Sequence, residues 1–269
     1  MPRIVQVGLA VIAIHSIFVK PATCQNSRES VPQNTCAYLE IQIESHSCHK
    51  NTANDYAQLS QFRAEDSHLQ SPSRGEQRVV YIGDSITASW PLVISKRFLG
   101  KPAINRGIAG QVSGQMLLRF RQDVVSLKPR VVVILAGTND VSRISDPSDL
   151  ALVENNLASM VDLAHANGIE VIVASLPPVS DYEYYDNGQS IIQTVARSPI
   201  LIRQLNKWIE EYARRSGCAF VDYFALLVDD KGFLKHGLSS DGLHPNAKAY
   251  SLLEPSLEEA LRKLLDQQQ

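Results

Sequence analysis

The chain has 269 residues, of which 44% are hydrophobic and 20% charged, with 14 glycines and four cysteines. This ordinary globular composition excludes a disordered chain, a collagen-like repeat and a disulfide-dense mini-scaffold. The formal net charge of −2 lacks the basic field of a nucleic-acid-binding protein, so we expect no nucleic-acid partner.

The first 24 residues have the pattern of a secretory signal peptide. Arg3 precedes a mostly apolar stretch over 4–19, which is shorter than the roughly 20 residues that span a bilayer. Ala22-Thr23-Cys24 then offers small residues for cleavage. An uncleaved anchor or a buried strand would also fit this stretch. We expect cleavage, hence a secreted or periplasmic protein without a stable membrane span; with the signal uncleaved, the protein would be membrane-anchored.

The cysteines differ in their surroundings. Cys24 would leave with the signal peptide, and Cys36 and Cys48 share one polar segment, where a disulfide would suit an exported protein. A metal site with the histidines beside Cys48 is the alternative, but no standard zinc spacing is met and we expect no metal. Cys218 lies in an apolar run and is expected to be a buried free thiol.

Residues 25–77 form a polar strap ahead of the main domain, which we place at 78–269. Tyr56, Leu59 and Phe62 follow a helical spacing, which predicts an amphipathic helix near 55–69 that packs on the main domain.

From residue 78 onward, short β-branched runs alternate with helical stretches. The run 131–135 is apolar throughout, as expected of a strand covered on both faces. Such alternation predicts right-handed βαβ units and a parallel sheet, with the reactive site at the carboxyl ends of the strands. The expected strands are 79–82, 103–104, 131–135, 170–174 and 218–221. The expected helices are 91–99, 111–127, 148–167, 199–216 and 246–265.

A serine follows the first expected strand, in Gly83-Asp84-Ser85. A serine at a strand-to-helix junction directs its hydroxyl over the sheet edge. The alternative is that Ser85 or Asp84 is simply a helix N-cap. The chain contains no Gly-x-Ser-x-Gly motif, so the usual α/β-hydrolase elbow is absent.

Three further loops carry residues suited to acyl transfer. Gly107 would let a backbone N–H approach a ligand, and Asn139 could donate to an anion; a turn glycine and an Asx turn are the alternatives. Asp241, three residues before His244, can hold one imidazole nitrogen and leave the other as a base. Its alternative is a surface turn before a helix at Pro245. With Ser85, these loops supply a nucleophile, a base, an orienting carboxylate and oxyanion donors.

These four blocks resemble the GDSL-type, or SGNH, esterase/lipase family over about residues 78–265. The matching motifs are Gly83-Asp84-Ser85, Gly107, Gly137-x-Asn139-Asp140 and Asp241-x-x-His244. The opening Gly83–Thr87, followed by Trp90, is similar to bacterial acylhydrolases and the platelet-activating-factor acetylhydrolase branch. The resemblance implies a three-layer α/β/α, flavodoxin-like fold with five parallel strands in the order 2-1-3-4-5. It also implies a serine hydrolase without metal or cofactor.

The resemblance also implies a role for each matched residue. Ser85 would attack an ester carbonyl, His244 would take its proton and Asp241 would hold the imidazole. The N–H groups of Ser85 and Gly107 and the amide of Asn139 would bind the oxyanion. We expect Asp84 to support the loop rather than to react.

The substrate is predicted from the stretch 176–199, which is too long for a routine connection and is expected to flank the site. Tyr182, Tyr184 and Tyr185 would stack on a sugar or line an acyl pocket; a solvated loop with one tyrosine packed down is the alternative. No long apolar lid is visible, so we expect a small-molecule or carbohydrate ester with a short acyl or acetyl group. A carbohydrate O-acetylesterase, an acyltransferase and a non-catalytic binding module are the alternatives.

Overall fold

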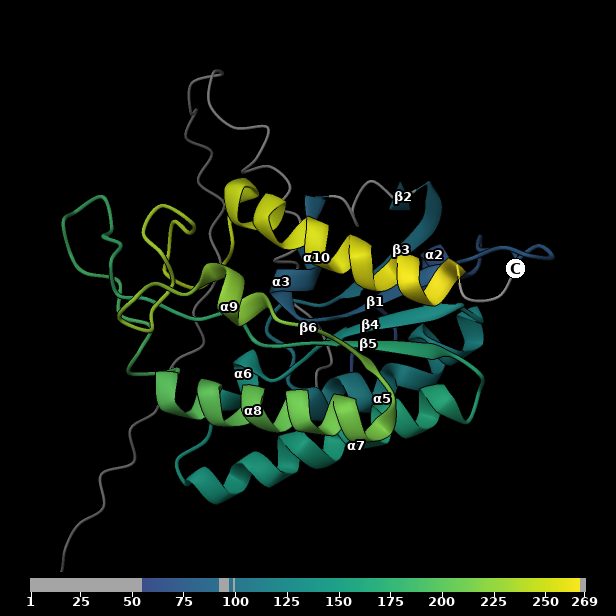
Figure 1. Ribbon diagram of the computed structural model, residues 1–269, viewed down its shortest axis with the longest axis horizontal. Coiled ribbons are helices and arrows are strands. Elements are labelled where there is room, and N and C mark those ends of the chain that lie inside the picture. Colours follow the sequence, from purple (N-terminus) through teal and green to yellow (C-terminus); the bar gives the residue numbers. More distant parts are fainter. Residues whose placement is uncertain (1–54, 92–96, 99, 267–269) are drawn as a thin grey trace, which may run out of the picture. The chain divides into compact units, whose positions relative to one another are not determined.

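Figure 1 shows the computed structural model of the protein, which describes residues 55–91, 97–98 and 100–266. All of these residues lie in one compact unit. The expected signal peptide and the cysteines Cys36 and Cys48 lie outside the described residues. Cys218 is a free thiol as expected, but it is half-buried rather than buried.

Within the described residues, six strands form one sheet in the order β2-β3-β1-β4-β5-β6. Their bounds are β1 (Val79–Gly83), β2 (Arg97–Phe98), β3 (Lys101–Gly107), β4 (Val131–Leu135), β5 (Glu170–Ala174) and β6 (Ala219–Val221). The strands from β3 to β6 pair in parallel, and β2 pairs with β3 in the antiparallel sense at one edge. The five parallel strands therefore have the predicted 2-1-3-4-5 order, which confirms the α/β fold.

Helices cover both faces of this sheet (Figure 1), giving the predicted three layers. One face packs against α5 (Ser113–Asp123), α7 (Leu150–His165) and α8 (Pro199–Ser216). The other packs against α3 (Ser85–Ala88), α9 (Tyr223–Leu227) and α10 (Ala247–Asp266). The alternation of side chains along β1 decides which residue faces which layer: Val80 and Ile82 join the first core, and Val79 and Tyr81 the second.

The long predicted helices form with ends that differ by at most a few residues, and α8 matches its predicted bounds. The helix expected over 91–99 is wrong at its end, because Arg97 and Phe98 form β2 and pair with Pro102 and Lys101. Gly100, at φ +71°, allows the chain to reverse between the two strands. The rest of that prediction, 92–96 and 99, lies outside the described residues.

The helix expected near 55–69 is confined to one turn, α2 (Arg63–Asp66). Ahead of it, the Asp55 carboxylate accepts the Leu59 N–H, and Gln58 takes a left-handed conformation at φ +57°. This turn interrupts the helical spacing, so Tyr56 and Leu59 are exposed at 57% and 36% instead of packing on the main domain.

Ion pairs attach this segment to the sheet where apolar packing was expected. The side chain of Arg106 on β3 is fully buried and pairs with Glu65 and Asp66 of α2. Its guanidinium also lies 4.4 Å from the centre of the Phe62 ring, a cation–π contact. Of the three predicted apolar side chains, that of Phe62 therefore makes this contact. Tyr56 and Leu59 bond to α5 through their backbone carbonyls, which accept from Gln115 and Gln122.

Candidate active site

The predicted nucleophile, base and carboxylate meet at the carboxyl end of the sheet. Ser85 is the first residue of α3, directly after β1, and His244 and Asp241 lie in the loop that leads to α10. The Ser85 hydroxyl lies 2.9 Å from Nε2 of His244, and His244 Nδ1 lies 2.6 Å from Asp241 Oδ2. Residues 159 positions apart in the chain thus form one continuous hydrogen-bonded chain.

Asp84 caps the helix that begins at Ser85. Its carboxylate accepts the Ile86 N–H at 2.9 Å, which leaves the Ser85 hydroxyl for His244. The N-cap alternative raised for this loop therefore applies to Asp84. The side chain is fully buried, and burial raises the pKa of Asp84 to about 6, against the hydrogen bond from Ile86 and the nearby His244, which lower it.

The loop before α10 is folded around the Asp241 carboxylate. Oδ1 accepts the backbone N–H groups of Leu243 and His244 at 2.9 and 2.8 Å, and also the Ser239 hydroxyl. Burial acts to raise the pKa of Asp241, but the hydrogen bonds from His244 and Leu243 outweigh it and hold the pKa well below its usual value. The carboxylate is therefore ionised and aimed at the imidazole.

A glycine is required within this loop. Gly242 has φ +74°, and a Cβ there would lie 2.1 Å from the carbonyl oxygen of Ser180. The Ser180 N–H in turn donates to the Gly242 carbonyl at 2.9 Å. Close backbone contact thus joins the loop to the segment that follows β5 (Figure 1).

Asn139, in the short helix α6 (Thr138–Val141) after β4, directs its amide nitrogen toward the site. Nδ2 lies 3.1 Å from the Gln111 carbonyl oxygen and 3.4 Å from Asp84 Oδ2. The second contact is long for a hydrogen bond, so one amide hydrogen is weakly held. On its other side, Asn139 Oδ1 accepts a hydrogen bond from Arg197 at 3.2 Å.

Gly107 ends β3 against α3, where a Cβ would lie 2.2 Å from the Ala88 nitrogen. Only glycine allows the strand to approach the helix this closely. The Gly107 N–H donates to Asn105 Oδ1 at 2.8 Å, so an oxyanion would have to share this donor with the Asn105 side chain.

The three predicted substrate-binding tyrosines differ in their surroundings. The Tyr182 hydroxyl donates to Asp229 at 2.7 Å, and its ring packs edge-on against Phe233. Tyr184 and Tyr185 are 64% and 55% exposed. One tyrosine is therefore packed down, and two are free to contact a ligand.

The structure adds three residues that sequence reasoning missed: Gln111, Gln193 and Arg197 contact the predicted site residues through hydrogen bonds. They belong to no motif. The only sequence signal for two of them was the unusual length of the connection between β5 and α8.

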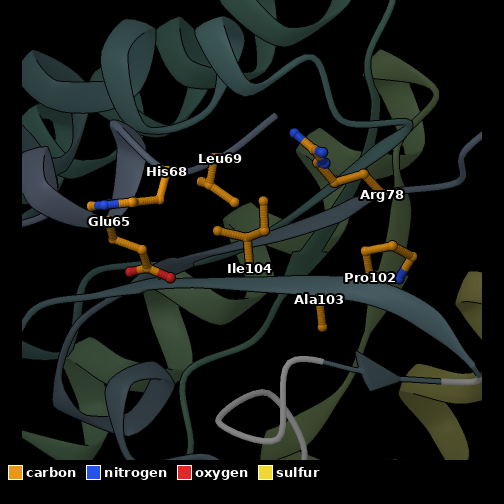
Figure 2. Close-up of a pocket in the computed structure, with 7 residues that line it drawn as sticks. All are labelled: Glu65, His68, Leu69, Arg78, Pro102, Ala103 and Ile104. Carbon is orange, nitrogen blue, oxygen red and sulfur yellow. The ribbon is translucent and has the colours of Figure 1, made fainter. Parts of the chain in front are cut away.

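A separate cavity of about 300 Å³ lies at the amino end of β3 (Figure 2). It is lined by Glu65, His68, Leu69, Arg78, Pro102, Ala103 and Ile104. Glu65 and Arg78 already pair with protein groups. The cavity lies at the opposite end of the parallel strands from Ser85 and is therefore distinct from the site described above.

Among the described residues, no group of three or more His, Cys, Asp or Glu side chains could hold a metal ion. Likewise, no helix in the described part of the chain is both long and apolar enough to cross a membrane.

Comparisons with known proteins identify the family of the chain. The GDSL-like Lipase/Acylhydrolase family matches residues 81–252. Esterase TesA of Pseudomonas aeruginosa is 26% identical over 201 residues, 70% of this chain and 90% of that protein. A GDSL-like lipase structure from Bacteroides thetaiotaomicron is 35% identical, with a TM-score of 0.67 over 77% of this chain and 98% of that one.

A more distant structure shares the fold alone. The acetylxylan esterase of Geobacillus stearothermophilus is 22% identical, with a TM-score of 0.54 over 69% of this chain and 94% of that one. From the family match and the esterase relatives together, we conclude that the chain belongs to the GDSL-like lipase/acylhydrolase (SGNH) family and is a carboxylic ester hydrolase.

Proposed function

We propose that this protein is an exported serine esterase that cleaves short-acyl or acetyl esters, with Ser85, His244 and Asp241 as its catalytic triad. The observation that carries the proposal is the continuous hydrogen-bonded chain between these residues, at 2.9 and 2.6 Å. This arrangement of nucleophile, base and orienting carboxylate is what acyl transfer through a serine requires. Export is supported by the signal-like pattern of residues 1–24.

The first half of the reaction forms an acyl-enzyme. Ser85 Oγ attacks the ester carbonyl carbon while its proton passes to Nε2 of His244. The tetrahedral intermediate collapses as the bond to the alcohol oxygen breaks and His244 gives that oxygen the proton. Asp241, ionised and bonded to Nδ1, stabilises the imidazolium that exists between these two steps.

The second half releases the acid. Water attacks the acyl carbon and gives a proton to His244; the bond to Ser85 Oγ then breaks, and the serine recovers its proton. The carboxylic acid leaves, and the enzyme returns to its starting state.

The oxyanion of both tetrahedral intermediates would be bound by three donors. These are the Ser85 N–H at the start of α3, the Gly107 N–H and the Asn139 amide. Loss of one such donor typically costs about 2.7–4 kcal/mol of barrier. Asp84 supports this arrangement, because its carboxylate caps α3 and lies against the Asn139 amide.

A carbohydrate O-acetyl ester is the second candidate substrate. The exposed rings of Tyr184 and Tyr185 are suited to stack on a sugar face. Transfer of the acyl group to an acceptor other than water would use the same triad.

The test is hydrolysis of p-nitrophenyl acetate, butyrate, octanoate and palmitate, and of acetylated xylo-oligosaccharide, by the wild type and by Ser85→Ala. We expect turnover of the acetyl and butyryl esters that falls at least about 10⁴-fold in the variant. Ser89→Ala, which removes an exposed hydroxyl next to the same helix, is the matched control and should be fully active. Equal turnover by Ser85→Ala and the wild type would overturn the proposal. Preference for the oligosaccharide would favour the second candidate.

A further inference from the structure

The segment between β5 and α8 reaches the site at both of its ends. In Figure 1 this green segment lies at the same end of the sheet as the yellow-green loop that precedes α10. Near its start, Ser180 bonds to the backbone of Gly242. Farther along, the Asp181 carboxylate accepts the backbone N–H groups of Gln193 and Thr194. The second half of the segment is thereby held against the loop that carries Asp241.

Arg197, which lies in this segment, links Asn139 to the loop that carries Asp241. Its Nη2 donates to Asn139 Oδ1 at 3.2 Å, and its Nη1 donates to Gln193 Oε1 at 3.1 Å. Gln193 Nε2 donates in turn to the Asp241 carbonyl oxygen at 2.9 Å. A series of side-chain hydrogen bonds therefore runs from the proposed oxyanion donor to the backbone of Asp241.

The contacts with Arg197 and with the Gln111 carbonyl together decide which way the Asn139 amide points. A guanidinium has donors and no acceptor, so it can face only the oxygen of the amide. A flipped Asn139 would place its NH₂ group against the donors of Arg197 and its oxygen against the Gln111 carbonyl. Both contacts would be repulsive. The hydrogen bond to Oδ1 also polarises the amide, which strengthens Nδ2 as a donor.

We propose that Arg197 is a positioning residue for ester hydrolysis. It holds Asn139 so that Nδ2 faces the oxyanion, and through Gln193 it also holds the loop that carries Asp241. The inference rests on the proposed function, because it assigns Asn139 to the oxyanion hole. Arg197 itself touches neither Ser85 nor His244 in any hydrogen bond of the described residues. Its effect should therefore be transmitted mainly through Asn139, which it contacts directly.

The test is a double-mutant cycle between Arg197→Met and Asn139→Ala, with kcat and KM measured on p-nitrophenyl butyrate. Arg197→Met should lower kcat about tenfold or more and change KM less than about threefold, because the lost positioning matters in the transition state. Asn139→Ala should lower kcat about 100-fold or more. In the Asn139→Ala background only the link through Gln193 is left to lose, so Arg197→Met should have a clearly smaller effect there than in the wild-type background.

The matched control is Arg203→Met, which removes an exposed arginine from the neighbouring helix α8 and should leave both constants unchanged. Thermal unfolding of each variant shows whether it is folded. If Arg197→Met does not fold, Arg197→Lys replaces it. A lysine keeps the charge but cannot bridge Asn139 and Gln193 in the same planar geometry, so a smaller loss with the same non-additivity is expected.

Three results would overturn the inference while Ser85→Ala remains inactive. Arg197→Met could match the wild type, it could raise KM at an unchanged kcat, or it could lower kcat equally in the wild-type and Asn139→Ala backgrounds. The second would make Arg197 a substrate-binding residue, and the third would show that it acts independently of Asn139. An active Ser85→Ala would instead overturn the proposed function.

Discussion

Two arginine networks hold the Asn139 amide from opposite sides, and they differ in burial. On one side, Arg119 of α5 donates to Gln111 Oε1, and the Gln111 carbonyl accepts Asn139 Nδ2. On the other side, Arg197 donates to Asn139 Oδ1. The side chains of Arg119 and its partner Asp123 are 0% and 1% exposed, whereas Arg197 is half-buried and lies in a connecting segment.

Arg119 is thus a core residue, whereas Arg197 lies at the edge of the core. Arg119 uses all three guanidinium nitrogens, on Gln111, Asp123 and the Gly83 carbonyl. Its removal would leave several buried polar groups without partners. Among the described residues, the guanidinium of Arg197 donates only to the side-chain amide oxygens of Asn139 and Gln193. We therefore expect the loss of Arg119 to act mainly on folding and the loss of Arg197 mainly on turnover.

The largest expected effect on stability is that of Arg119→Met. The substitution leaves the Asp123 carboxylate buried without its ion-pair partner, which typically costs about 3–5 kcal/mol. Urea unfolding should show this loss in the free energy of unfolding. Arg121→Met, which removes an exposed arginine from the same helix, should change it by less than about 0.5 kcal/mol. A loss below about 1 kcal/mol for Arg119→Met would remove the contrast between the two networks.

Asp84, which lies between the two networks, should make stability depend on pH. Burial raises its pKa to about 6 in the folded state, above the ordinary value of 3.8. The folded protein therefore binds this proton more tightly, and stability rises as pH falls from about 7 to 4. The difference of about two pKa units corresponds to about 3 kcal/mol.

The measurement is the free energy of unfolding of the wild type and Asp84→Asn between pH 4 and 7. The wild type should gain stability relative to the variant as pH falls, and curves that stay parallel would contradict the raised pKa. Arg197→Met sharpens the comparison, because the positive charge of Arg197 lowers the pKa of Asp84. Without that charge, the gain should begin at a higher pH.

Much of the fold was predictable because its elements have strong local patterns. The uninterrupted apolar run of β4 and the spacing of α8 each specify one structure. The edge strand β2 has two residues, too few for any periodicity. The expected helix near 55–69 failed because a side-chain contact of Asp55 and the left-handed Gln58 decide the backbone there. Neither feature alters the pattern of apolar residues.

The site divides in the same way. Ser85, Asp241 and His244 were predicted because acyl transfer needs these residue types at the ends of strands, and the structure brings them within hydrogen-bonding distance. Gln111, Gln193 and Arg197 support other residues, a task that many side chains could perform. Only the three-dimensional structure shows which residues they contact. The hydrogen bond from the Gly107 N–H to the Asn105 side chain likewise could not be predicted from a sequence motif.

The smallest expected effect is that of Gln193→Leu, which tests how far the Arg197 network extends. The variant loses the donor to the Asp241 carbonyl and one acceptor of Arg197. Arg197 keeps its bond to Asn139, and the Asp241 carboxylate keeps its backbone donors. We therefore expect kcat to fall about two- to tenfold, the range of one ordinary hydrogen bond, and less than in Arg197→Met.

Steady-state kinetics on p-nitrophenyl butyrate would measure this effect, with Gln189→Leu, at an exposed position of the same segment, as the matched control. A loss in Gln193→Leu larger than in Arg197→Met would make the link to Asp241, rather than the hold on Asn139, the main task of the segment. A smaller loss in Gln193→Leu, absent in the control, would agree with the geometry. The direct contact of Arg197 with the Asn139 amide would then matter more for kcat than its indirect link to the Asp241 loop through Gln193.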